Sequence, residues 1–107
     1  MSATEEERRP IVYIPNKSDQ DFSDAARFGD PLYLTTELVN PYGTNTIHRL
    51  IAKRMKDVSP SDYILVSSLN ILTAIASGVM AYRTGQANFL LYRRGKYVER
   101  TLAFSVS

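Results

Sequence analysis

The sequence predicts an α/β fold: a mixed five-stranded sheet with three parallel strands, crossover helices and a C-terminal antiparallel hairpin. Three observations predict it. Short runs of β-branched and aromatic residues alternate with segments in which apolar residues recur every three or four positions. Glycine, proline and polar turn residues separate the two kinds of segment. Hydrophobic residues make up 44% and charged residues 22% of the 107 residues, a composition that suits one globular core.

The first third of the chain predicts two strands with a short helix between them. Residues 11–14 read Ile-Val-Tyr-Ile and are followed by proline, as in a short buried strand. Residues 23–28 can form a short helix, with Asp21 as its N-cap and Gly29 at its C-terminal end. Residues 31–36, Pro-Leu-Tyr-Leu-Thr-Thr, predict the second strand.

The middle of the chain predicts a helix, a strand and a second, more apolar helix. Apolar residues spaced by three and four over residues 47–58 predict the first helix, with Thr44 or Asn45 as its N-cap. Residues 63–66, Tyr-Ile-Leu-Val, lack alternation, as expected of a strand covered on both faces. Residues 69–83 are apolar nearly all round, which predicts a helix buried on more than one side.

The last part of the chain predicts a hairpin. Residues 87–92 form the fourth strand, Arg94 and Gly95 the tight turn, and residues 97–104 the fifth strand. Apolar and polar residues alternate along the fifth strand, which indicates one wetter face.

We expect residues 1–10 to form a flexible tail and residues 11–107 a single α/β domain. The first ten residues are polar and include Glu5, Glu6 and Glu7. We see neither a signal peptide nor a membrane span, which needs about 20 apolar residues. The sequence has no cysteine, which excludes disulfides and thiolate metal sites. We therefore expect a cytoplasmic protein without a metal or cofactor.

The predicted order of elements gives a first candidate site. Right-handed crossovers make the first three strands parallel, and we expect strand 1 to lie between strands 2 and 3. Ligands of open α/β sheets favour the crevice where the winding direction reverses, beyond the carboxyl ends of the strands. A helix N-terminus there suits a phosphate or carboxylate, although the same residues also suit ordinary helix capping. The candidate ligand-binding residues are Asn16, Lys17, Ser18, Ser67, Ser68 and Asn70.

The hairpin gives a second candidate site. Residues 63–107 carry five Lys or Arg side chains and a single acidic one, Glu99. Cations contact phosphates and tyrosines stack on bases, so the mixture suits single-stranded nucleic acid. A charged edge strand that avoids pairing with other proteins gives the same pattern. The candidate nucleic-acid-binding residues are Tyr92, Arg93, Arg94, Lys96, Tyr97 and Arg100.

Small residues within the long apolar helix give a third hypothesis. Ala74, Ser77, Gly78 and Ala81 permit close approach of another element. They serve either packing within the domain or a face for a homo-oligomer.

Residues 13–18 read Tyr-Ile-Pro-Asn-Lys-Ser, residues 61–66 Ser-Asp-Tyr-Ile-Leu-Val and residues 94–100 Arg-Gly-Lys-Tyr-Val-Glu-Arg. These three segments resemble small uncharacterised proteins of tailed bacteriophages. The resemblance covers most of residues 11–102. It implies a viral origin and an intracellular site of action, and it carries over no functional residues.

These observations favour a phage-encoded binding protein over an enzyme, since no catalytic residues are indicated. Its expected target is a host protein, another host macromolecule or single-stranded nucleic acid. The alternatives are a nucleotide or phosphoryl-ligand binder or small phosphodiester-cleaving enzyme that uses the two loops, and a structural homo-oligomer.

Overall fold

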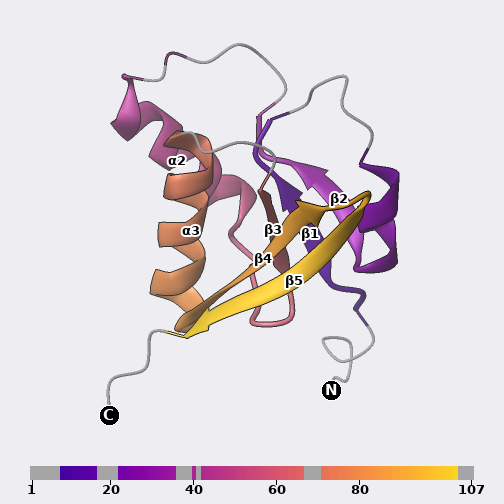
Figure 1. The fold of residues 1–107 in the computed structure, drawn as a ribbon. Coiled ribbons are helices and arrows are strands. Elements are labelled where there is room, and N and C mark those ends of the chain that lie inside the picture. Colours follow the sequence, from indigo (N-terminus) through magenta and orange to yellow (C-terminus); the bar gives the residue numbers. More distant parts are fainter. Residues whose placement is uncertain (1–7, 17–21, 36–39, 41, 67–70, 104–107) are drawn as a thin grey trace.

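The computed structural model of the protein describes residues 8–16, 22–35, 40, 42–66 and 71–103. Within them the chain forms five strands, two α-helices and one 3₁₀ helix (Figure 1). In chain order these are β1 (Ile11–Ile14), the 3₁₀ helix η1 (Ser23–Arg27), β2 (Asp30–Tyr33), α2 (Thr44–Arg54), β3 (Tyr63–Val66), α3 (Ile71–Thr84), β4 (Gln86–Arg93) and β5 (Lys96–Ala103).

The strands form one mixed sheet in the order β2-β1-β3-β4-β5. β1 pairs in parallel with β2 and β3, and β4 pairs with β5 in the antiparallel direction. The predicted fold class is therefore confirmed, as is the position of strand 1 between strands 2 and 3. β4 also pairs in parallel with β3, because α3 makes one more crossover before the hairpin. The parallel part of the sheet thus has four strands.

Three local boundaries differ from the sequence predictions. β2 ends at Tyr33, although the backbone N–H of Leu34 still donates to β1 across 2.8 Å. The N-cap of α2 is Gly43, so the prediction of Thr44 or Asn45 was wrong. The short helix is 3₁₀ and starts after Phe22, whose side chain makes no capping hydrogen bond. The predicted cap, Asp21, lies outside the described residues.

The sheet is covered differently on its two faces. α2 and α3 lie side by side on one face (Figure 1) and bury an apolar cluster with the sheet. That cluster includes Tyr13, Ile51, Ile64, Met80 and Ala87. No helix among the described residues is long and apolar enough to cross a membrane.

The opposite face is covered by η1 and by the β4–β5 ribbon, defined here as residues 86–103. β5 crosses in front of β3 and β1 in Figure 1 and reaches η1. Tyr97 of β5, 1% exposed, packs in one cluster with Val12, Ile14 and Leu65. A twisted two-stranded ribbon can bend this way because right-handed twist accumulates along it. The hairpin therefore closes over the sheet instead of extending it as a flat edge.

The carboxylate of Asp62, fully buried, joins the ends of several segments. Arg8 donates to both of its oxygens, across 3.0 and 2.9 Å. The backbone N–H groups of Ile11 and Ser59 each donate to it across 2.9 Å. The pairing with Asp62 raises the pKa of the Arg8 guanidinium. Burial, together with the nearby Asp62 charge, raises the pKa of Tyr13 to about 12. A charged group in this buried environment is therefore unfavourable unless a partner of opposite charge or a hydrogen bond offsets its loss of solvation.

Residues 8–10 belong to the segment expected to be a flexible tail, and all three are attached to the domain. Arg9 pairs with Asp30 and donates to the carbonyl of Ala26. The carbonyl of Pro10 accepts from the N–H of Asp30 across 2.9 Å. Only glycine fits at position 29, because a Cβ there would lie 2.2 Å from the Pro10 carbonyl oxygen. Residues 1–7 lie outside the described residues.

Replacing Arg8 with alanine is expected to lower the free energy of unfolding by roughly 3 kcal/mol, because it leaves a buried carboxylate without its cation. Arg9→Ala is the matched control, since the side chains of Arg9 and Asp30 are 58% and 61% exposed. Its expected loss is below about 1 kcal/mol. Urea unfolding monitored by circular dichroism measures both. Equal losses of unfolding free energy for the two variants would show that the buried Arg8–Asp62 pair stabilises the fold no more than the exposed Arg9–Asp30 pair.

Candidate functional site

The first candidate site lies at the carboxyl ends of β1, β2 and β3. Of its six predicted residues only Asn16 is described; Lys17, Ser18, Ser67, Ser68 and Asn70 lie outside the described residues. The Asn16 side-chain amide lies 2.8 Å from the hydroxyl of buried Thr35. That hydroxyl donates to the carbonyl of Pro15, also across 2.8 Å. In the described part of the chain, Asn16 therefore joins the ends of β1 and β2.

The hairpin turn lies at Arg94 and Gly95, where the sequence predicted a tight turn. Arg94 and Gly95 both have positive φ, 53° and 86°, as in a type I′ turn. Glycine adopts this conformation freely, whereas a long side chain pays a steric cost. Arg94 is the one described residue other than glycine with positive φ. The chain therefore carries a cation at a position where backbone strain favours asparagine or glycine.

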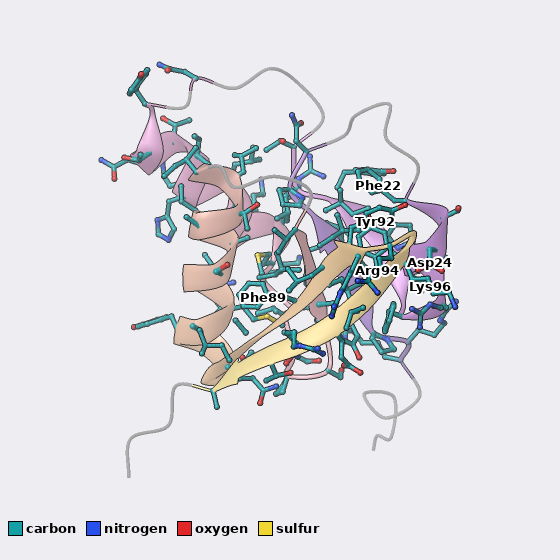
Figure 2. The ribbon with its side chains drawn as sticks, in the orientation of Figure 1. Phe22, Asp24, Phe89, Tyr92, Arg94 and Lys96 are labelled. Atoms are coloured by element: carbon teal, nitrogen blue, oxygen red, sulfur yellow. The ribbon has the colours of Figure 1, made fainter. Side chains whose placement is uncertain are left out.

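Alternation along β4 and β5 gives the ribbon two distinct faces. Ala87 and Phe89 pack with residues of α3, whereas Leu90 and Tyr97 belong to the cluster on the other side of the sheet. Figure 2 shows Phe89 on the side of α3 and Tyr92 on the side of η1. With the register of the strand pair, these positions define the outer face of the ribbon as the side chains of Phe89, Leu91, Arg93, Lys96, Val98, Arg100 and Leu102.

The two predicted tyrosines do not share that face. Tyr97 is buried, and its ring meets the ring of Tyr92 edge to face, with centroids 5.2 Å apart. Tyr92 is 58% exposed but points to the inner side. Stacking on bases needs an accessible ring next to the cations. The structure thus separates the tyrosines from Arg93, Lys96 and Arg100, which sequence reasoning had grouped with them.

The cations of the hairpin are exposed. Arg93, Arg94, Lys96 and Arg100 all lie at the surface, and Arg100 donates to the backbone carbonyl of Glu99 across 2.8 Å. The Glu99 carboxylate accepts from the Tyr63 hydroxyl on the inner side. Burial, and to a lesser extent this hydrogen bond, raises the pKa of Tyr63. The acidic group of the ribbon is therefore directed away from the basic outer face.

Apolar side chains lie between these cations. Leu91 is 40% and Leu102 is 52% exposed, and Val98 is half-buried. Next to Leu91, a groove of about 700 Å³ separates α3 from β4. Its described lining residues are Val66, Ile71, Thr73, Ala74, Ser77, Phe89 and Leu91. The outer face thus combines positive charge with an apolar strip that continues into the groove.

Two side chains of η1 hold the tip of the ribbon. Asp24 accepts from the backbone N–H of Tyr97 across 2.8 Å, and Arg27 donates to the Tyr97 carbonyl across 2.6 Å. Figure 2 shows Asp24 close to Lys96 at this tip. The hydrogen bond from Tyr97, followed by that from Arg27, lowers the pKa of Asp24. We call these two contacts the η1 latch.

Sequence reasoning missed the latch and the apolar part of the outer face. Side chains alternate between the two faces along residues 87–92 and 96–103. This alternation could have identified Leu91 and Leu102, because it places them on the same face as the arginines. Asp24 and Arg27 carry no such signal, since they lie about 70 positions from their backbone partner.

The homo-oligomer face on α3 stays a prediction. Of the small residues of α3, Ala74 and Gly78 are exposed, whereas Ser77 and Ala81 are half-buried. No group of three or more histidine or acidic side chains in the described part of the chain can hold a metal ion.

One comparison with known proteins gives a match. The family model described as "Phage Pam3 gp32-like protein" matches residues 10–104, which is most of the sequence. No curated protein and no solved structure matches the chain.

Replacing Arg94 with asparagine is expected to raise the free energy of unfolding by up to about 1 kcal/mol, because asparagine tolerates positive φ better. Arg93→Asn is the control. Arg93 lies within β4, and asparagine is disfavoured in strands, so no gain in the free energy of unfolding is expected there. Urea unfolding measures both variants. If Arg94→Asn proved less stable than the unmodified chain, contacts of the arginine side chain would outweigh the strain.

Proposed function

Given that the chain belongs to the phage Pam3 gp32-like protein family, and so is a small phage protein, we propose that it is a non-enzymatic binding module. Its target is an acidic protein partner, which it engages through the outer face of the β4–β5 ribbon. We further expect this encounter in the host cytoplasm, a reducing compartment that a cysteine-free sequence suits.

The observation that carries the proposal is the mixture of exposed cations and exposed apolar side chains on one face. Arg93 and Arg100 provide positive charge beside Leu91 and Leu102, and Lys96 lies at the tip, close to Asp24. Protein interfaces combine an apolar centre with charged groups that steer and align the partner. A purely solvated surface does not require leucines at 40% and 52% exposure on a strand pair.

Charge favours an acidic partner. Residues 63–107 carry five Lys or Arg and one acidic residue, and Glu99 is directed to the inner side, where it meets Tyr63. The same charge disfavours a second copy of the chain at this face, because two basic surfaces repel one another. The strain at Arg94 supports a functional role for the cation at the turn.

A protein partner is better supported than single-stranded nucleic acid. Binding of single strands depends on aromatic rings that stack on bases beside the cations. Tyr97 is buried and Tyr92 lies on the inner side. The aromatic ring of the outer face is Phe89, which is half-buried against the cluster under the helices, so the exposed groups of that face are cations and aliphatic side chains. Such a face suits the mixed acidic and apolar surface of a protein.

Capture from a lysate of phage-infected cells tests the proposal. The immobilised chain is compared with the double variant Arg93→Glu/Arg100→Glu and with a matched control on α2, Arg49→Glu/Lys53→Glu, which changes two exposed cations elsewhere. We expect an acidic protein to be retained by the unmodified chain and by the α2 control. The ribbon variant is expected to lose it, with retention unchanged by nuclease.

Two outcomes would overturn the proposal. Retained material that disappears after nuclease treatment would indicate a nucleic-acid target. Equal retention by all three proteins would show that the ribbon face is not the binding surface.

A further inference from the structure

We propose that the partner binds by strand addition: an extended acidic segment pairs antiparallel with the free edge of β5 over residues 99–103. This inference rests on the proposed function and specifies how the partner is held. Strand addition supplies main-chain hydrogen bonds, while alternate side chains of the added strand provide specificity.

The geometry of the hairpin determines which backbone groups face outward. In a two-residue hairpin the residues flanking the turn, Arg93 and Lys96, form a hydrogen-bonded pair. Every second residue of β5 from Lys96 onward therefore bonds to β4. The N–H and C=O groups of Tyr97 must then point away from β4, and the η1 latch confirms this, since Asp24 and Arg27 reach them from outside.

The same alternation leaves three more residues with outward backbone groups: Glu99, Thr101 and Ala103. β5 is the last strand in the sheet order. Arg100 covers the carbonyl of Glu99. Among the described residues no backbone group pairs with the outer edge beyond Tyr97. The latch closes this edge at the tip, and in the described part of the chain the edge has no backbone partner from Glu99 onward, where the one contact is that of Arg100 with the Glu99 carbonyl.

The open stretch is also accessible. All five residues from 99 to 103 are exposed, in contrast to buried Tyr97. Edge strands in natural proteins are usually shielded by a covering element, a proline, a bulge or charges. This stretch has no proline, and within the part of the chain that the structure describes its shielding is limited to Glu99 and Arg100. An exposed edge of this kind can accept one more strand.

Side chains beside the edge specify the chemistry of the added strand. On the outer face Arg100 alternates with Val98 and Leu102, so the neighbouring positions of the partner suit one carboxylate and flanking apolar residues. On the inner face Thr101 suits a small polar residue. The occupant we infer therefore alternates threonine-like residues with valine and glutamate. A second copy of β5 does not fit, because it would add arginines to a basic face.

A synthetic peptide provides the probe. It alternates threonine with valine and glutamate over nine residues, and calorimetry measures its affinity for the full chain. In antiparallel pairing, residues of one hydrogen-bonded pair share a face, so the threonine amides are the ones that bond to β5. N-methylation of these amides is expected to weaken binding at least roughly tenfold. N-methylation of the valine and glutamate amides is the matched control and is expected to leave the affinity unchanged.

Amide exchange provides a second readout. Binding of the unmodified peptide is expected to slow exchange at Thr101 and Ala103 and to leave α3 unchanged. If the peptide binds in a manner sensitive to Arg100→Glu but indifferent to N-methylation, strand addition is wrong and the proposed function stands. If the peptide does not bind at all, strand addition is also wrong, and the capture experiment decides the proposed function independently.

Discussion

The carboxylate of Asp62 joins donors from separate segments at the amino ends of β1 and β3. It accepts from Arg8 and Ile11 before and within β1, and from Ser59 in the turn before β3. The same turn continues the network, because the Asn88 side chain donates to the carbonyls of Pro60 and Asp62. A buried carboxylate without these donors would be strongly unfavourable. The placement of β1 relative to β3 therefore depends on this carboxylate, and Asn88 ties β4 to the backbone of the same turn.

The position of the ribbon follows from that anchor. The Asn88 side-chain carbonyl accepts from Thr101 across 2.8 Å, which ties the base of β5 to the same network. At the other end the η1 latch holds Tyr97. Between the two fixed points the inner face of the ribbon contributes to the core. On the outer face Phe89 packs with the cluster under α3, whereas Leu91 and Leu102 are exposed. The same folding constraints that bury Tyr97 thus expose Leu91, Arg93 and Arg100 together.

Much of the fold could be predicted from local patterns, and the candidate surface only in part. Unpatterned apolar runs such as residues 63–66 identify buried strands, and right-handed crossovers then limit the strand order. The position of the tight turn was visible as Arg94-Gly95, whereas its type I′ geometry was not predicted. Local sequence patterns do not indicate the path of the β4–β5 ribbon across the sheet. Tyr97 reads as an alternating surface residue and is in fact a core residue, so the predicted mixture of tyrosines and cations is divided between two faces.

Long-range polar contacts explain the other differences. The cap of α2 is Gly43, with no side-chain hydrogen bond, so residue preference at the N-cap was outweighed by the context of the turn. Asp24 and Arg27 look like an ordinary i, i+3 helix pair, and they do form one at 3.4 Å. Their contact with a strand edge about 70 residues away depends on the fold as a whole. The contact of Asp24 and Arg27 with Tyr97 shows which backbone groups of β5 point outward. The edge of β5 that we propose to bind a partner could therefore be identified only from the structure.

Native-state amide hydrogen exchange of the free protein tests the arrangement of β5 most directly. Because alternate residues of β5 face β4, we predict slow exchange at Val98, Arg100 and Leu102, and slow exchange at Tyr97, whose N–H is held by Asp24. Glu99, Thr101 and Ala103 are predicted to exchange much faster. Protection of Thr101 and Ala103 equal to that of Arg100 and Leu102 would show that the outer edge is already paired, which would contradict the account.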